Sequence, residues 1–397
     1  MNLIDAIAAQ SDALRAIRRD IHAHPELAFE ETRTADLVAD CLTRWGIPIH
    51  RGLGGTGVVG TIRGTAGDSD RAIGLRADMD ALPMTEANTF EHASKTPGKM
   101  HACGHDGHTT MLLGAAQYLA ANRDFAGTVY VIFQPAEEHG GGARVMMQDG
   151  LFEQFPMQAV FGVHNMPGIP AGTIALSPGP VLASNNEFAL TIQGKGGHAA
   201  MPHLAVDPIA IAAQVIQAFQ NVVSRNVKPL EAAVVSVTMI EAGEVPNVIP
   251  GTCTLRGSVR AYTAETLDLI ERRLGEIAQM TCAAHGATAD FHFQRNYPAT
   301  FNHDAETAFA REVIAGVVSP GALVAQVPIM AAEDFSFMLQ EMPGCYAFIG
   351  NGDGEHRDAG HGQGPCLVHN TSYDFNDEIL PLGATYFVRL AQAWLAR

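Results

Sequence analysis

Residues 100–108 read Met-His-Ala-Cys-Gly-His-Asp-Gly-His and combine three histidines with a cysteine and an aspartate. Thiolate and imidazole side chains together suit zinc or a similar first-row cation. Cys103 and His105 stand on either side of Gly104, so both can reach one ion only from a tight, irregular turn. The segment therefore predicts a metal site, with a histidine-rich surface loop as the alternative.

Three more apolar stretches end in side chains that could join this site. Residues 128–133 form a continuous apolar run, typical of a strand buried on both faces, and Glu137 and Glu138 follow in a loop. Neighbours in an extended loop point in different directions, so one glutamate can bind a metal while the other transfers protons. His164 and His369 also follow apolar residues. An exposed acidic loop and structural histidines are the alternatives.

A buried strand is also expected at residues 73–77, directly before Asp78 and Asp80. In open α/β sheets, functional side chains gather in the loops beyond the carboxyl ends of strands. A helix cap or a turn would explain the two aspartates equally well. A helix is predicted at 108–122, so Cys103 and His105 should lie immediately before its positive dipole end, which favours a thiolate.

The order of expected elements predicts how these residues are held. The chain has 397 residues, more than one hydrophobic core usually fills, and 47% of them are hydrophobic, so two domains are expected. Helical periodicity marks 2–21 and 31–45, with Pro25 following the first helix. A final helix is expected at 380–395.

The middle of the chain has a different pattern. Its expected elements follow the order βαββαβ of a ferredoxin-like unit: strand 187–193, helix 206–224, strands 233–240 and 252–260, helix 264–282 and strand 288–293. We therefore expect an α/β protein in which a mixed sheet flanked by helices forms a metal-binding catalytic domain, residues 1–183 and 295–397. A ferredoxin-like dimerisation or lid domain, residues 184–294, interrupts it.

Polar residues in this middle region could bind a carboxylate or an oxyanion. His198 follows a glycine-rich stretch, Asn247 lies in the connection between the two central strands, and Arg260 ends a strand. Ordinary turns, and a surface charge in the case of Arg260, are the alternatives.

Charge and composition restrict the partners. The net charge of −17 argues against binding to nucleic acid or to an anionic membrane, and no run of about 18 apolar residues predicts a membrane span. Small molecules are therefore the expected partners. Six cysteines without a Cys-x-x-Cys pair, and an N-terminus without a basic segment before an apolar run, predict the reducing cytoplasm.

Several phrases, in order and spread over nearly the whole chain, resemble those of hippurate hydrolases and plant auxin-conjugate hydrolases, a branch of the aminoacylase-like two-metal exopeptidases. They are His22-Ala-His-Pro-Glu-Leu, Leu75-Arg-Ala-Asp-Met-Asp-Ala-Leu-Pro, the segment 100–108, Gln134-Pro-Ala-Glu-Glu, Gly196-Gly-His-Ala-Ala and Asn247-Val-Ile-Pro. The wider family has His-x-Asp where this chain has Arg76-Ala-Asp78, and an aspartate where it has Cys103.

The resemblance implies hydrolysis of N-acyl amino acids with two divalent ions per chain. It assigns Cys103 as the bridging ligand, His105 and His164 to one ion, Glu138 and His369 to the other, Glu137 as the catalytic carboxylate and Asp78 as an orienting residue. A thiolate bridge favours zinc, although manganese, nickel or cobalt is common in this branch.

The resemblance also implies a homodimer, or a tetramer, in which His198 of the inserted domain serves the site of the other chain and Asn247 and Arg260 bind the substrate. Three alternatives remain at this stage. They are a two-metal dipeptidase or exopeptidase, an amidase with Cys103 as its nucleophile, and a non-catalytic small-molecule binding protein with one structural zinc.

Overall fold

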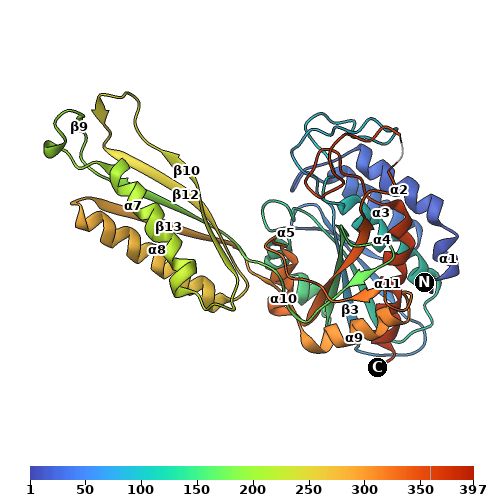
Figure 1. The fold of residues 1–397 in the computed structure, drawn as a ribbon. Coiled ribbons are helices and arrows are strands. Elements are labelled where there is room, and N and C mark those ends of the chain that lie inside the picture. The colour runs from blue at the N-terminus through green and yellow to red at the C-terminus, as the bar shows by residue number, and fades with distance from the viewer. Residues whose placement is uncertain (358) are drawn as a thin grey trace. The chain divides into compact units, whose positions relative to one another are not determined.

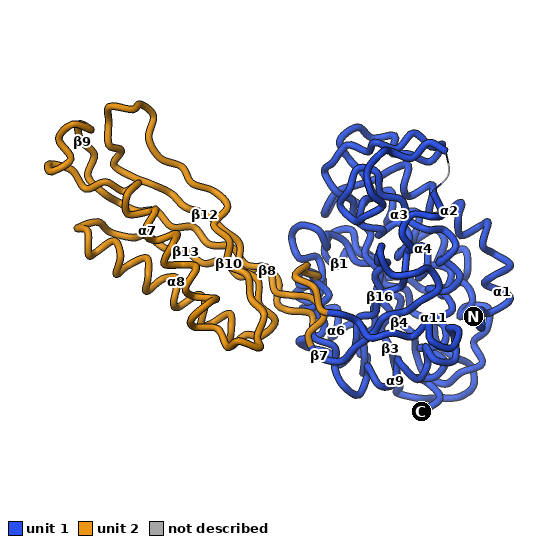
Figure 2. Tube along the Cα trace, in the orientation of Figure 1, with its two compact units in different colours: residues 1–179, 301–327, 334–397 blue, residues 180–300, 328–333 orange. Residues whose placement is uncertain are grey.

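The computed structural model describes residues 1–357 and 359–397 and divides into two compact units. Unit 1 comprises residues 1–179, 301–327 and 334–397, and unit 2 comprises residues 180–300 and 328–333 (Figure 2). The domain boundaries expected from the sequence, which place residues 184–294 in the inserted domain, stay a prediction.

A mixed sheet of eight strands forms the centre of unit 1. Its strands are β1 (Ile49–Leu53), β2 (Gly57–Arg63), β3 (Ala72–Asp78), β4 (Thr128–Gln134), β5 (Val160–Pro167), β6 (Ile174–Ala175), β15 (Leu323–Val324) and β16 (Gly344–Gly352). They follow the order β1-β2-β4-β3-β5-β16-β6-β15. Because β4, β3, β5 and β16 are parallel neighbours, their carboxyl ends share one edge of the sheet, where a functional site is expected.

Helices cover both faces of this sheet (Figure 1). They are α1 (Asp5–Ala8), α2 (Ser11–Ala23), α3 (Thr32–Arg44), α4 (His105–Ala121), α5 (Gly142–Gln148), α6 (Leu151–Gln154), α9 (Asp304–Ala315), α10 (Phe335–Glu341) and α11 (Leu380–Leu395), with the short helix η3 (Asp377–Ile379) before α11. α4 and α11 pack against each other and against β3, whereas α5 and α10 pack together on the other side. The helix expected at 2–21 is divided into α1 and α2.

The start of α4 corrects one expectation. The helix was expected to begin at His108, but it begins at His105, which is therefore part of its first turn. Gly104 supplies the reason, because its φ of +102° lets the chain turn sharply into the helix. A Cβ atom at this position would also lie 2.0 Å from Asn165 Oδ1, so no larger residue fits there.

Unit 2 contains the βαββαβ order expected from the sequence, and the predicted fold class is confirmed. Its sheet has the antiparallel order β10-β12-β8-β13, formed by β8 (Asn185–Gln193), β10 (Ala233–Glu241), β12 (Thr252–Ala261) and β13 (Thr288–Tyr297). α7 (Pro208–Asn221) and α8 (Ala264–Ala284) pack together against it (Figure 1). The shorter helix η2 (Val222–Asn226) contacts both of them, and η1 (Pro202–Leu204) contacts β9. β9 (Gly197–His198) and β11 (Val248–Ile249) form a separate ribbon.

The chain passes between the two units within β7 (Gly179–Leu182) and β14 (Thr300–Asn302), and again on either side of residues 328–333. Each unit has its own core of buried apolar side chains. None of the described helices combines the length and apolar character that a membrane span requires.

Candidate metal centre

Six of the residues singled out from the sequence gather in unit 1, around the edge where the parallel strands end. Cys103 lies in the turn before α4 and His105 in its first turn, while Glu137 and Glu138 follow β4. His164 lies near the end of β5, and His369 lies in the loop before η3. Residues that are far apart in the sequence meet here because neighbouring parallel strands end together.

Five of these side chains form two groups that share one atom. The ligating atoms of Cys103, His105 and His164 lie within 4.8 Å of one another, and so do those of Cys103, Glu138 and His369. Cys103 Sγ lies 3.3 Å from His164 Nε2, and Glu138 Oε1 lies 3.2 Å from His369 Nε2. Each group thus offers three ligand atoms near one point, and the Cys103 sulfur belongs to both groups. The arrangement therefore suits two ions that would share the Cys103 sulfur.

Two buried atoms that make no hydrogen bond within the described part of the chain support this interpretation. Among the described residues, His105 Nε2 is buried without a hydrogen bond, and Glu138 Oε1 has only the ion-pair contact with His369 Nε2 and no hydrogen bond. Buried polar atoms are nearly always hydrogen-bonded, so each of these atoms requires an explanation. A cation that accepts their lone pairs provides one.

The two histidines of the first group are oriented through their second ring nitrogen. His105 Nδ1 donates to Asp80 Oδ1 at 3.2 Å, and His164 Nδ1 donates to the backbone carbonyl of Asn165 at 2.5 Å. With the proton on Nδ1, the lone pair of Nε2 is directed into the cluster. Such partners fix the tautomer and raise the basicity of a metal-binding imidazole.

Asp80 connects the candidate metal ligands with Glu137, the candidate catalytic residue. The sequence did not reveal this role of Asp80. Its Oδ1 accepts the backbone N–H of Glu137 at 3.0 Å, and its Oδ2 accepts the backbone N–H of Glu138 at 2.9 Å. One carboxylate thus fixes His105 and both glutamates. The only signal in the sequence was the position of Asp80 just beyond a buried strand, which fits a helix cap equally well.

Asp78, the expected orienting residue, lies beneath the cluster. It pairs with Arg76 Nη1 at 2.6 Å and with His108 Nδ1 at 2.7 Å, and its Oδ2 lies 3.9 Å from His105 Nε2. Burial opposes its ionisation, but the neighbouring His105, Arg76 and His108 outweigh burial and hold the pKa of Asp78 well below its usual range. Asp78 is thus an anion at the base of the site.

The surroundings of Cys103 also disfavour its thiolate unless a cation lies nearby. Burial raises the pKa of its thiol well above the usual range, and the carboxylates of Glu138 and Glu137 add to this effect. The N-terminus of α4 offers only a partial compensating charge. A stable thiolate therefore needs cations at this place, which fits the proposed ligand set.

The other three candidate residues belong to unit 2. His198 is exposed on β9, which pairs with β11 so that His198 lies opposite Val248, next to Asn247. The backbone carbonyl of Asn247 accepts the N–H of Ala199 at 3.1 Å. Arg260 lies half-buried on β12. The β9–β11 ribbon thus brings His198 and Asn247 together, as their glycine- and proline-rich loops allow.

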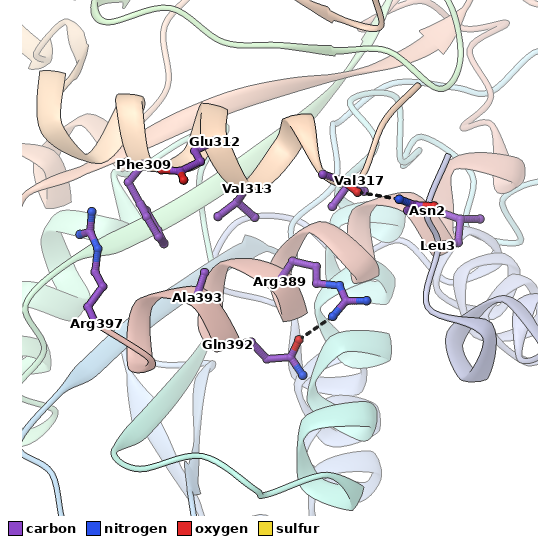
Figure 3. Close-up of a pocket in the computed structure, with 11 residues that line it drawn as sticks. Asn2, Leu3, Phe309, Glu312, Val313, Val317, Arg389, Gln392, Ala393 and Arg397 are labelled. Atoms are coloured by element: carbon purple, nitrogen blue, oxygen red, sulfur yellow. Dashed lines mark hydrogen bonds between the residues drawn. The ribbon is translucent and has the colours of Figure 1, made fainter. Parts of the chain in front are cut away.

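A cavity of about 800 Å³ in unit 1 is distinct from this cluster (Figure 3). It lies between α9, α11 and the N-terminal residues Asn2 and Leu3, and Arg389 and Gln392 hydrogen-bond each other at 3.1 Å on its wall. Its lining contains no cysteine or histidine. Among the described residues that line it, Glu312 alone has an acidic side chain, too few for a metal site.

The fold and the candidate metal cluster are typical of a metal-dependent hydrolase, and comparison with known proteins agrees. Residues 74–393 match Peptidase family M20/M25/M40. The chain belongs to this family, which confirms both the resemblance seen in the motifs and the predicted class of enzyme, a hydrolase of amide bonds.

The relatives cover the chain from end to end. A hippurate hydrolase of Campylobacter jejuni is 41% identical over 396 residues, which is 100% of both chains. An IAA-amino acid hydrolase of Arabidopsis thaliana is 39% identical and covers 97% of this chain and 86% of its own. The crystal structure of a dinuclear metal binding peptidase of the M20 family from Bacillus subtilis superposes with a TM-score of 0.84, at 32% identity over 98% of this chain and 99% of that one.

Proposed function

We propose that the enzyme hydrolyses the amide bond of N-acyl amino acids, giving a carboxylic acid and a free amino acid, and that two divalent cations serve this reaction. His105 and His164 would hold one cation and Glu138 and His369 the other, with Cys103 shared. The observation that carries the proposal is this pair of ligand groups with one sulfur in common. The names of the hippurate and IAA-amino acid hydrolases support the class of substrate.

The reaction needs a base beside the cations, and Glu137 fits that role. When bound, the cations would acidify a water molecule and polarise the amide carbonyl. Glu137 accepts the proton of the attacking water and passes it to the nitrogen of the leaving amine. Its Oε1 accepts the backbone N–H of Asp334 at 3.3 Å, and its Oε2 lies 4.0 Å from His105 Nε2, so the carboxylate faces the cluster.

Zinc is the cation that the ligand set favours, because three histidines, a carboxylate and above all a shared thiolate suit a borderline-soft ion. Manganese, nickel and cobalt remain candidates that also accept nitrogen and oxygen ligands. Metal analysis of the purified enzyme, together with reconstitution of the chelated enzyme by each metal in turn, tests this choice.

Unit 2 would bind the amino-acid end of the substrate. Arg260 can form a bidentate pair with the free α-carboxylate, with Asn247 as a neutral donor, and His198 would donate a hydrogen bond to the oxyanion as it forms. We further propose a homodimer in which His198 serves the metal cluster of the other chain. Comparing turnover of N-acyl amino acids that differ only in the acyl group would define the substrate.

The reducing cytoplasm is the compartment that we propose for this enzyme. All six cysteines are free and buried. Cys103 must remain reduced to serve as a ligand.

A further inference from the structure

The segment that precedes α3 reaches the loop that carries Glu137. Glu31 stands at the N-cap position of α3, but its side chain makes no capping hydrogen bond to that helix. Instead, Oε1 of Glu31 accepts the backbone N–H of Ala136 at 2.8 Å, and Oε2 accepts the hydroxyl of Thr56 at 2.6 Å. The Glu31 side chain is completely buried, and burial of an ionisable group costs free energy unless hydrogen bonds or charges compensate for it.

Ala136, the residue that Glu31 contacts, has an unfavourable backbone conformation. Its φ is +55°, in the left-handed region that L-residues other than glycine rarely adopt. Glu137 follows directly, so the direction of its side chain depends on this turn. Such backbone strain persists only where the surroundings hold it. Here the N–H of Ala136 is bound by Glu31, and its carbonyl accepts the N–H of Gly142 at 3.0 Å.

A second contact joins the same two segments. Phe29, two residues before Glu31, also has a positive φ, of +62°, and its ring lies against Gly140. A Cβ atom on Gly140 would lie 2.5 Å from Phe29 Cε2, so the close approach requires glycine. Residues 29–31 thus contact the Glu137 loop on both sides of the catalytic candidate.

We propose that Glu31 is a positioning residue for amide hydrolysis, which stabilises the left-handed turn at Ala136 and thereby aims the Glu137 carboxylate at the attacking water. The inference rests on the proposed role of Glu137. Asp80 fixes the backbone N–H of Glu137 itself, at 3.0 Å, whereas Glu31 fixes the preceding residue. Together they hold the two peptide units that flank the Cα atom of Ala136.

Glycine at position 136 offers a direct test, because glycine adopts the left-handed conformation without the steric penalty of alanine. We expect Glu31→Ala to lower kcat by about 10-fold or more with little change in KM or metal content, since misplacing a catalytic group affects the chemical step. Adding Ala136→Gly to that variant should restore most of kcat. Glu31→Gln should also stay active, because its amide can accept from Ala136 and donate to Thr56.

The neighbouring Glu30 provides a matched control. Its side chain is 63% exposed and pairs with Lys99 at 2.8 Å, so Glu30→Ala should leave kcat unchanged. The inference would be overturned if Glu31→Ala kept wild-type kcat, or if Ala136→Gly failed to rescue it. A loss of kcat that came with an equal loss of metal would also overturn it.

Two further measurements separate this inference from the proposed function. Amide hydrogen exchange at Ala136 should accelerate in Glu31→Ala, and unchanged exchange would refute the positioning contact whatever the role of Glu137. Kinetics of Glu31→Ala combined with Glu137→Gln test the coupling, because Glu31 should contribute nothing further once the base is absent. Full activity of Glu137→Gln alone would refute the proposed function, while the exchange result would still report on the turn.

Discussion

Asp80 accepts the backbone N–H of Glu137 at 3.0 Å while it also binds the ring of His105, a candidate metal ligand. Asp80 therefore supports both the candidate base Glu137 and the candidate metal site. The Glu137 side chain itself does not belong to either of the two ligand groups that share Cys103. Glu137→Gln keeps the size of the side chain and removes the proton acceptor. We expect kcat to fall by at least about 10²-fold with unchanged metal content, measured by turnover and by elemental analysis of the same samples.

Glu138→Gln is the matched control for that prediction. Glu138 Oε1 lies 3.2 Å from His369 Nε2 and belongs to the second ligand group, so this variant should lose metal together with activity. If Glu137→Gln were the variant that lost metal, the roles of the two glutamates would have to be exchanged.

Activity should also require two ions per chain and the Cys103 sulfur. Exhaustive chelation is expected to abolish turnover, and Cys103→Ala, which removes the only atom that both ligand groups share, should reduce the metal content below two ions per chain. Elemental analysis beside kinetics checks this. Full turnover after chelation, or a single tightly bound ion per fully active chain, would contradict the two-metal site.

The sequence named candidate ligands, which stay a prediction, but it did not reveal the contacts that support them. Cys103, His105 and Glu138 each lie beside a strong local pattern, a dense metal-binding segment or a strand that ends in carboxylates. Parallel strand order brings such positions together, whereas the assignment of each candidate ligand to one of two ions came from the family resemblance.

The contacts that support the candidate site leave no comparable pattern in the sequence. Glu31 binds Ala136 across 105 positions of sequence, and neither the left-handed φ of Ala136 nor that of His369 is signalled by a glycine. The start of α4 was misplaced for a related reason, because the turn at Gly104 depends on its close approach to Asn165. Contacts between distant segments decided these features, and local periodicity does not report them.

Recognition of a free α-carboxylate gives a further prediction. Removing the guanidinium in Arg260→Met, which keeps much of the side-chain length, should raise KM for an N-acyl amino acid by about 10-fold or more, since a charge-assisted bidentate pair is lost. The same variant should discriminate little between that substrate and its α-amide, whereas the wild type should prefer the acid. Equal wild-type rates on the acid and the amide would exclude carboxylate recognition.

Glu31 should make stability depend on pH. Burial, with a contribution from the Asp80 charge, raises its pKa from 4.5 to about 7. Between these values the folded chain retains a proton that the unfolded chain has released, so the free energy of unfolding falls as pH rises through this window and levels off above it. The difference in this free energy between wild type and Glu31→Gln should therefore decrease by on the order of 3 kcal/mol from pH 4.5 to 7.5.

Denaturant unfolding of the metal-free proteins at several pH values measures this difference without the pH dependence of metal binding. Glu30→Gln serves as the comparison, because the Glu30 carboxylate is exposed and should show little of this slope. A constant difference between wild type and Glu31→Gln across the window would refute the raised pKa.

The last prediction tests whether the site is completed across a dimer. His198 is exposed on the β9–β11 ribbon of unit 2, whereas the candidate metal ligands belong to unit 1. We have proposed that His198 of one chain serves the cluster of the other. His198→Ala and Glu137→Ala should each be nearly inactive alone. In a mixed dimer, one site combines native Glu137 from one chain with native His198 from the other, because a twofold interface makes the exchange reciprocal. Random reassortment of equal amounts forms half the dimers as mixed pairs with one intact site of two, so roughly a quarter of wild-type activity should return.

Differently tagged chains show whether mixed dimers have formed, and each variant reassorted with itself gives the baseline. The recovered activity should scale with the fraction of doubly tagged dimers, and its KM should match that of the wild type because the intact site contains only native residues. Mixed dimers that assemble but remain inactive would rule out the shared site, and a monomeric active enzyme would rule it out as well. If His198 served its own chain, every site in the mixed dimer would lack either the base or the oxyanion donor, so activity would stay at the baseline.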